Sequence, residues 1–230
     1  MGLITYLQDA IYWNLIYESR YQLIVSGLWI TLLLTFASFF FGTLFGMLFC
    51  MAKGSKNRVL RGLCNIFTGL LVKLPPLMLL MIFAYLILAG TGLSSVVIAI
   101  ITFTLKCSAH LAEMFRSAVD SVEKGEIEAA RTLGYSKWQA FFRVVFPQAV
   151  HQVMPLYKTQ FVLTMQDTSV VSLLAIQDMT RAVTIITSRT MDPIIALVIT
   201  SVIYLLLGFA ANRMLGAADR NRHFKNTELM

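Results

Sequence analysis

The longest polar interruption in this chain reads EIEAARTLGYSKWQAFFRVVFP, from Glu126 to Pro147. Good helix formers fill its first eight residues, and Gly134 then permits a sharp change of direction where a side chain would clash. Ser136 with Gln139 three residues later is a capping-box pattern, so a second helix is expected to begin there. The stretch therefore predicts a helix–turn–helix.

The predicted second helix has an apolar side and ends at a proline. Trp138, Phe141, Phe142 and Val145 recur at helical spacing, and Pro147 is expected to stop the helix. Charges of both signs occur along the same stretch, so we expect an aromatic stripe and a charged stripe on a membrane surface. An ordinary amphipathic loop lying at the interface is the plainer alternative.

Composition indicates an integral membrane protein. Hydrophobic residues make up 57% of the 230 positions, charged residues 13%, and the mean hydropathy is +0.72. A soluble domain of this size carries about 25% charged residues. The net charge of +7 comes from basic residues beside apolar spans, which argues against a nucleic-acid partner. The three cysteines show no metal-ligand spacing.

Five apolar stretches are long enough to cross a bilayer, so we expect an all-α membrane protein with one domain, residues 1–230. Pro75 and Pro76 are expected to break the second stretch. Gly42 and Gly46 would allow the first helix to approach a neighbour closely. The expected membrane core is 20–215, with spans at 21–51, 62–89, 93–119, 150–176 and 193–215, after a short interfacial helix within 1–20.

Basic residues set the expected orientation. Short basic loops stay on the cytoplasmic side of a membrane. One basic group lies between the first two spans and another lies around the end of the last span: Lys53, Lys56, Arg58, Arg61, then Arg213, Arg220, Arg222 and Lys225. We therefore expect the N-terminus outside, the loop 120–147 and the tail 216–230 in the cytoplasm, and the polar segment 177–192 outside.

Ionisable groups inside apolar spans are costly and tend to face a pathway or a partner. Lys106, His110 and Glu113 are spaced by four and three residues, and so lie along one face of the third span. The fourth span holds Lys158 and Asp167. Two interpretations stay open: a role in a transport pathway, or internal pairing that fixes packing, of Lys106 with Glu113 or with a neighbouring helix.

Motifs of enzymes are missing from the sequence. No phosphate-binding GxxxxGK[ST] occurs, so this chain is not expected to bind ATP. No His, Cys or Glu cluster has metal-ligand spacing, and no Ser-centred nucleophile motif appears. We expect neither a catalytic residue nor a metal site.

The polar stretch resembles the EAA loop of ABC-transporter permeases. Glu128, Ala129 and Ala130, then Gly134, match that family's Glu-Ala-Ala and Gly, and residues 144–147 (VVFP) stand for its Ile-x-Leu-Pro. Other segments resemble the polar amino-acid uptake branch: 112–116 (AEMFR) its Ala-Glu-x-x-Arg, 146–149 (FPQA) its Leu-Pro-Gln-Ala, 71–77 (LVKLPPL) its Arg-Gly-Thr-Pro-Leu, and 166–170 (QDTSV) its Lys-Asp-Thr-Ser-Leu.

This resemblance implies a type I ABC importer permease in the bacterial plasma (inner) membrane. Its implied partners are a cytoplasmic ATPase dimer that carries ATP and Mg, a second permease copy, a substrate-binding protein outside, membrane lipid and an amino-acid substrate. The polar stretch would be the coupling helix that docks on the ATPase, with these residues bearing the load: Glu128, Ala129, Ala130, Gly134, Trp138, Phe141 and Phe142.

The substrate is expected to be a polar amino acid, and the sequence is most similar to glutamate/aspartate permeases in the run 166–169. Lys106, with His110, would attract a substrate carboxylate in the dry pathway, where Coulombic preference is stronger than in water. The candidate pathway residues are Lys106, His110, Glu113, Gln166, Asp167, Thr168 and Ser169.

Two other functions are consistent with a membrane protein of this kind. An ion-coupled secondary transporter or channel subunit would use Glu113 and Asp167 as ion or proton sites. Five unrepeated spans argue against it, because secondary transporters often have paired inverted halves. A membrane-anchored structural or signalling subunit would carry no flux.

Overall fold

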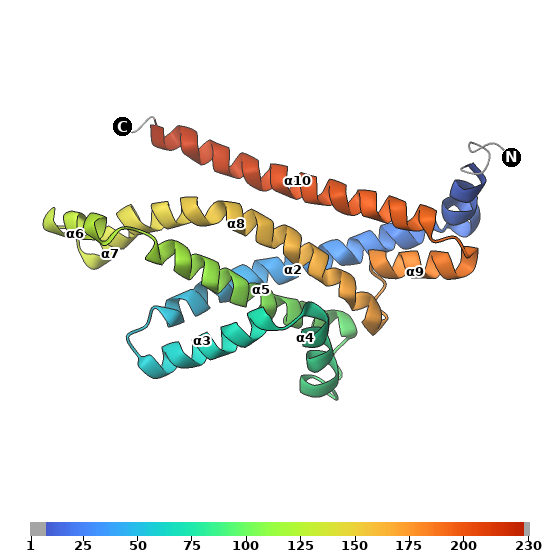
Figure 1. Cartoon of the computed structure of the whole chain (residues 1–230), viewed down its shortest axis with the longest axis horizontal. Coiled ribbons are helices and arrows are strands. Elements are labelled where there is room, and N and C mark those ends of the chain that lie inside the picture. Colours follow the sequence, from blue (N-terminus) through green and yellow to red (C-terminus); the bar gives the residue numbers. More distant parts are fainter. Residues whose placement is uncertain (1–7, 228–230) are drawn as a thin grey trace.

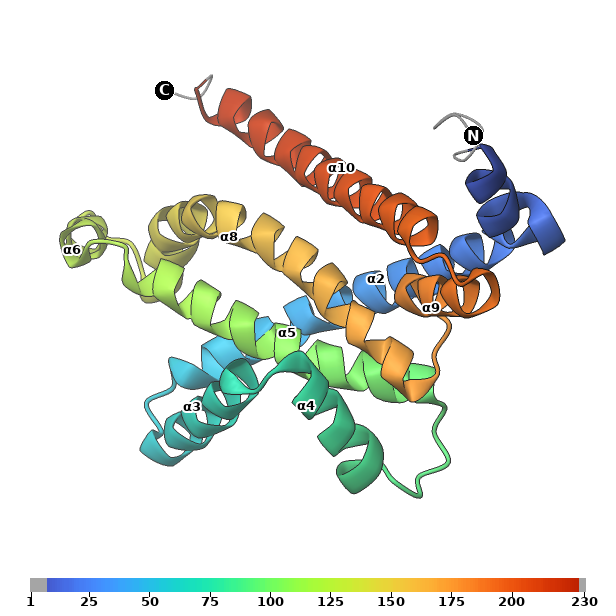
Figure 2. The same cartoon turned by 45° about the vertical axis from the view of Figure 1, so that its right-hand side comes forward.

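Two long helices form the centre of the molecule. The computed structural model describes residues 8–227, and this part of the chain is helical with connecting turns. Helices α2 (Tyr21–Lys53) and α5 (Ser95–Asp120) lie side by side in both views (Figures 1 and 2). Added Cβ atoms on Gly42 and Gly46 would lie 2.9 Å from the Cβ atoms of Cys107 and Leu111, respectively. The close approach predicted from these glycines is confirmed.

The hydrophobic core sits where these two helices meet the later elements. Leu34 of α2 and Phe103 of α5 pack against Leu80 and Val171, and all four side chains are buried. Much of the remaining apolar surface of the helices is exposed, as expected for a protein whose solvent includes lipid.

Prolines break the second predicted span. Helix α3 (Arg58–Lys73) begins at Asn57, whose side chain accepts a hydrogen bond from Val59 N. Helix α4 (Pro76–Ile82) and the wider turn η3 (Phe83–Ile87) follow, and the two halves meet at 115°. A proline at the start of a helix is tolerated because its missing N–H would have no partner there. The predicted break is confirmed, and its size makes this a sharply bent element.

The fourth span is continuous with the polar stretch. Helix α8 (Phe146–Asp167) passes into η5 (Thr168–Leu174), and α9 (Met179–Thr190) follows after a bend of 48°. Asp178 begins α9, where its side chain accepts from Arg181 N at 2.9 Å. Sequence reasoning described 177–192 only as a polar segment. In the structure it holds a helix that packs on α2, close to Gly27.

Helix α10 (Ile194–Thr227) runs the length of the bundle at its edge (Figure 1). Three helices, α2, α5 and α10, are each long and apolar enough to cross a membrane, and the number is five if each bent pair is one span. The turn from α2 to α3, the polar loop and the end of α10 lie together at one end, which we call the loop end (Figure 1). The N-terminal segment and α9 lie at the opposite end.

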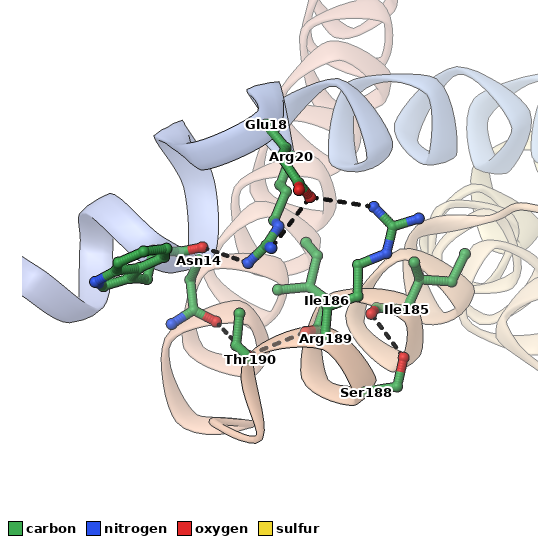
Figure 3. A network of polar contacts seen from close by, with 9 residues as sticks. Asn14, Glu18, Arg20, Ile185, Ile186, Ser188, Arg189 and Thr190 are labelled. Carbon is green, nitrogen blue, oxygen red and sulfur yellow. Dashed lines mark hydrogen bonds and ion pairs between the residues drawn. The ribbon is translucent and has the colours of Figure 1, made fainter.

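A polar network holds the N-terminal segment against α9 (Figure 3). Arg20 is buried and donates to Trp13 O at 2.7 Å and to Glu18 at 3.2 Å. Glu18 also lies 3.8 Å from Arg189 of α9, and Thr190 Oγ1 donates to Asn14 Oδ1 at 3.2 Å (Figure 3). These contacts fold the aromatic N-terminal turns, η1 (Tyr12–Ile16) and η2 (Tyr17–Ser19), against α9.

Candidate functional site

An ion pair lies near the middle of the bundle. Lys106 is the twelfth of the 26 residues of α5, and its Nζ lies 3.1 Å from Asp167 Oδ2 at the end of α8. The Lys106 side chain is 9% exposed and that of Asp167 27%. An unpaired charge at this depth would be expensive. The pairing of Lys106 with a neighbouring helix was one of the two interpretations of the sequence, and the structure brings these two predicted residues together.

The other predicted pathway residues differ in how deeply they are buried and in whether their polar groups are free to face the pair. His110 is half-buried, one turn further along α5. Thr168 is buried but donates to Met165 O at 2.7 Å, so its hydroxyl serves its own helix. Ser169 is half-buried and Gln166 is exposed. The structure therefore brings Lys106, His110 and Asp167 toward one region, while Thr168 closes the helix end.

Glu113 belongs to a second ion pair, nearer the loop end. Lys53 Nζ, at the end of α2, donates to Glu113 Oε1, and Thr68 Oγ1 of α3 lies 3.4 Å from the same oxygen. Glu113 is thus separated from Lys106, so the suggested Lys106–Glu113 pair does not form. Sequence reasoning counted Lys53 among the loop charges and missed this contact. Lys53 stands where the first span meets the basic loop, and this position could have indicated that its side chain points back toward a carboxylate of a neighbouring span.

The polar loop begins with a helix closed by a glycine. Helix α6 (Lys124–Thr132) exposes Glu128 and Ala129 and buries Ala130. Gly134 has a φ of +89°. Its N–H donates to Arg131 O at 3.0 Å, while Tyr135 N donates to Ala130 O at 3.2 Å. This is the hydrogen-bond pattern of a Schellman motif, in which glycine at the left-handed position ends the helix. The predicted turn at Gly134 is confirmed.

The second helix of the loop begins as predicted and ends elsewhere. At the start of α7 (Lys137–Ala140), Ser136 Oγ accepts from Gln139 N at 3.3 Å and Gln139 Oε1 accepts from Ser136 N at 2.8 Å, which confirms the capping box. The prediction that Pro147 stops this helix is wrong. A wider π turn, η4 (Phe141–Val145), precedes the proline and the helix continues into α8. Pro147 stands in the first turn of α8, where proline is tolerated.

The aromatic residues of this loop divide between two environments. Trp138 and Phe142 are 70% and 56% exposed. Phe141 is half-buried and lines a pocket of about 290 Å³ between the end of α5 and the loop, and Val145, predicted on the same stripe, also lines it. Gln148 donates to Glu126, which fastens α6 to the beginning of α8. The predicted stripe is therefore not one continuous surface: Trp138 and Phe142 are exposed, whereas Phe141 and Val145 line the pocket.

Acidic, histidine and cysteine side chains do not cluster in the described part of the bundle. Among residues 8–214, no group of three such side chains is placed to hold a metal ion. The two ion pairs place opposite charges inside the helical bundle, where they could bind a charged ligand. The loop forms a helical surface at one end of the bundle, where another protein could bind.

Comparisons with known proteins agree with this architecture. The family described as "Binding-protein-dependent transport system inner membrane component" matches residues 38–223. The L-cystine transport system permease protein TcyB of Bacillus subtilis (strain 168) is 31% identical over 205 residues, which cover 88% of each chain. The probable amino-acid ABC transporter permease protein YckA of the same organism is 30% identical, covering 85% of this chain and 89% of its own.

A solved structure, "Crystal structure of an amino acid ABC transporter with histidines", has the same fold. It superposes with a TM-score of 0.81 at 26% identity, and the match covers 90% of this chain and 97% of that one. The family is a permease component and is not itself catalytic. Its match favours a multi-pass ABC-transporter subunit working with an ATPase over the ion-coupled alternative. We conclude that the chain belongs to the family of inner-membrane components of binding-protein-dependent transport systems.

Proposed function

We propose that this chain is the permease subunit of an ATP-driven importer for polar amino acids, and that the Lys106–Asp167 pair receives the charged head group of the substrate. The supporting observation is the pair itself, with Nζ and Oδ2 3.1 Å apart and the lysine buried near mid-helix. Every free α-amino acid carries an ammonium and a carboxylate close together. The pair presents the two complementary charges side by side.

Binding by exchange of partners keeps each charge compensated. As the substrate arrives, its carboxylate takes the place of Asp167 beside Lys106, and its ammonium takes the place of Lys106 beside Asp167. Removing one partner of a buried pair without replacement would cost about 3–5 kcal/mol. The exchange avoids this cost, and a ligand that lacks either charge would incur it. His110 and Gln166, which lie within one turn of the pair, would contact the substrate side chain.

Glutamate and aspartate are the narrower candidate substrates. The run 166–169 and the cation Lys106 favour them. That preference depends on positive charge left over for an acidic side chain, and Asp167 balances Lys106 in the structure. The half-buried His110, one turn from Lys106, is the polar side chain that would contact an acidic substrate side chain. Relatives named for L-cystine and glutamine support the wider class of polar amino acids.

Coupling to ATP hydrolysis is assigned to the exposed face of α6. Glu128 and Ala129 would meet the cytoplasmic ATPase, while Ala130, Gly134 and Phe141 hold the shape of the loop from beneath. Other partners in this proposal are a second permease copy and a binding protein that delivers substrate outside. The loop end would face the cytoplasm, which places the N-terminus outside.

Uptake by proteoliposomes containing the permease, its ATPase and its binding protein tests the proposal. We compare Lys106→Met, Asp167→Asn and the neutral double variant, with Lys56→Met as a control at an exposed lysine outside the spans. Both single variants and the double variant are expected to lose uptake by about tenfold or more, equivalent to about 1.4 kcal/mol. Retained thermal stability of the double variant would show that it still folds.

Recovery of uptake in the neutral double variant would contradict the proposal, because a pair that serves packing alone can be replaced by neutral side chains. Competition of labelled aspartate with unlabelled glutamate, glutamine, cystine and arginine then separates the substrate classes. Inhibition by acidic competitors alone supports glutamate and aspartate. Inhibition by neutral polar amino acids supports the wider class.

A further inference from the structure

Three aromatic rings form an exposed row along the start of the fourth span. Trp138, Phe142 and Phe146 are 70%, 56% and 48% exposed. The ring centroids of neighbours in the row are 6.0 Å apart in both steps, and the first two rings are stacked at 20°. Phe146 was not part of the predicted stripe. The spacing of four residues at each step places the three rings on one helix face. We call these three residues the aromatic row.

The row lies where a helix leaves the water and enters a span. Lys137–Leu174 is one continuous helical stretch, and the row occupies its first turns. Eight residues separate the first ring from the last, about 12 Å of helix rise. The headgroup region on each side of a bilayer is roughly 5–8 Å thick. A row of this length at this position reaches through the headgroups to the edge of the hydrocarbon.

The charges beside the row are of one sign. No Asp or Glu occurs between residues 129 and 166, whereas Lys137 and Arg143 lie within the first turns of the helix. Both basic side chains are on exposed residues. Arg143 also lies 5.5 Å from the ring of Tyr135. In contrast, α6 carries the acidic residues Glu126 and Glu128. Anionic phosphates complement the first surface, and a mixed-charge protein surface complements the second.

We propose that the aromatic row is a membrane anchor that lies among the lipid headgroups at the loop end, with Lys137 and Arg143 facing anionic phosphates. Tryptophan prefers this depth because its ring is apolar and its indole N–H needs a polar partner. Trp138 and Phe142, which the sequence analysis assigned to the ATPase contact, thus contact lipid, and the ATPase contact is confined to α6.

Quenching of tryptophan emission by brominated lipid tests this assignment. The chain has three tryptophans, and Trp13 and Trp29 lie toward the opposite end. The difference between the wild type and Trp138→Phe isolates the emission of Trp138. The full importer, with its ATPase bound, is reconstituted in phosphatidylcholine–phosphatidylglycerol vesicles. Bromine is placed near the glycerol end of the acyl chains in one preparation and near the methyl end in another.

We expect bromine near the glycerol end to remove most of the Trp138 emission, and bromine near the methyl end to remove much less. Equal or stronger quenching from the methyl end would overturn the headgroup placement. Emission that neither lipid quenches, and that changes when the ATPase is added, would assign Trp138 to the ATPase and overturn the proposal. The triple variant Trp138→Phe/Lys137→Gln/Arg143→Gln is the blank that isolates the Trp138 emission of the charge variant Lys137→Gln/Arg143→Gln.

The role of Lys137 and Arg143 is tested by changing the anionic lipid content of the vesicles. With the wild-type protein, replacing phosphatidylglycerol by phosphatidylcholine is expected to weaken quenching from the glycerol end. Lys137→Gln/Arg143→Gln, which keeps Trp138, should show the weaker quenching in both kinds of vesicle. Quenching that responds to phosphatidylglycerol equally in both proteins would exclude these two side chains as the phosphate contacts.

Discussion

At the scale of single residues, two buried lysines carry the largest cost of burying charge that we identify in this protein. Lys53 and Lys106 are each almost fully buried, and each meets one carboxylate on another helix. A buried ammonium without a partner carries a desolvation penalty of several kcal/mol, so neither lysine can lose its partner cheaply. Burying the lysine more deeply than the carboxylate makes both pairs asymmetric: the exposed fractions are 4% and 50% for Lys53 and Glu113.

That asymmetry predicts unequal effects of mutating the two partners. Glu113→Gln leaves a buried positive charge on Lys53, and we expect the free energy of unfolding to fall by about 2 kcal/mol. Lys53→Met leaves a half-exposed carboxylate that water can solvate, and the expected loss is about 1 kcal/mol or less. Thermal unfolding of the purified permease in detergent measures both.

The double variant Lys53→Met/Glu113→Gln is the control for this prediction. It removes the unpaired charge, so its stability is expected to recover to that of Lys53→Met. Losses that simply add in the double variant would mean that the two residues stabilise the protein independently, and the ion pair would then not be the cause.

At the scale of elements, local hydrogen bonds determine where the two helices of the polar loop end and begin. The end of α6 is set by the Schellman bonds around Gly134, and the start of α7 by the capping box of Ser136 and Gln139. Both motifs span fewer than seven residues, so the sequence predicts them without knowledge of the remaining fold. The π turn at Phe141–Val145 is different, since it lets the helix pass Pro147 and join α8, which packs on α5.

The two glycines of the loop offer a matched comparison. Gly134→Ala puts a Cβ on a residue with φ of +89°, at a cost of about 1–2 kcal/mol. Gly125→Ala lies within α6 in open space, where alanine favours helix by about 1 kcal/mol. In the assembled importer we expect Gly134→Ala to lower substrate transported per ATP hydrolysed and Gly125→Ala to leave this ratio unchanged. An equal effect of both substitutions would refute the role of the left-handed turn.

The whole molecule has a clear polarity along its long axis. The basic turn between α2 and α3, the loop with α6 and α7, and the end of α10 gather at the loop end, and the N-terminal segment lies at the other (Figure 1). Short basic loops remain in the cytoplasm because they resist translocation. We therefore propose that the N-terminal segment and the end of α10 lie on opposite sides of the membrane, with the loop end inside.

Labelling of single cysteines on intact cells checks this orientation. In a background where the native cysteines Cys50, Cys64 and Cys107 are alanine, Thr91→Cys is placed in the turn before α5 and Lys56→Cys in the turn before α3; both positions are exposed. A membrane-impermeant maleimide is expected to label Thr91→Cys on intact cells and Lys56→Cys only after lysis. The reverse pattern would invert the topology.

The sequence by itself determined the features that depend on nearby residues or on solvent. Apolar runs of span length and the separation of basic from neutral turns predicted a helical membrane protein, because lipid requires every backbone polar group to be satisfied within its own helix. The break at Pro75 and Pro76, the turn at Gly134 and the capping box needed only local sterics and hydrogen bonds.

Only the tertiary structure decided which distant groups meet. The sequence placed Lys106, His110 and Glu113 on one face of a helix, but the choice of Asp167 for Lys106 and Lys53 for Glu113 depends on how α2, α5 and α8 pack. The same holds for the N-terminal turns held by Arg20 and Glu18. Periodicity fixes the direction of a side chain around its own helix, and packing between helices fixes what it faces.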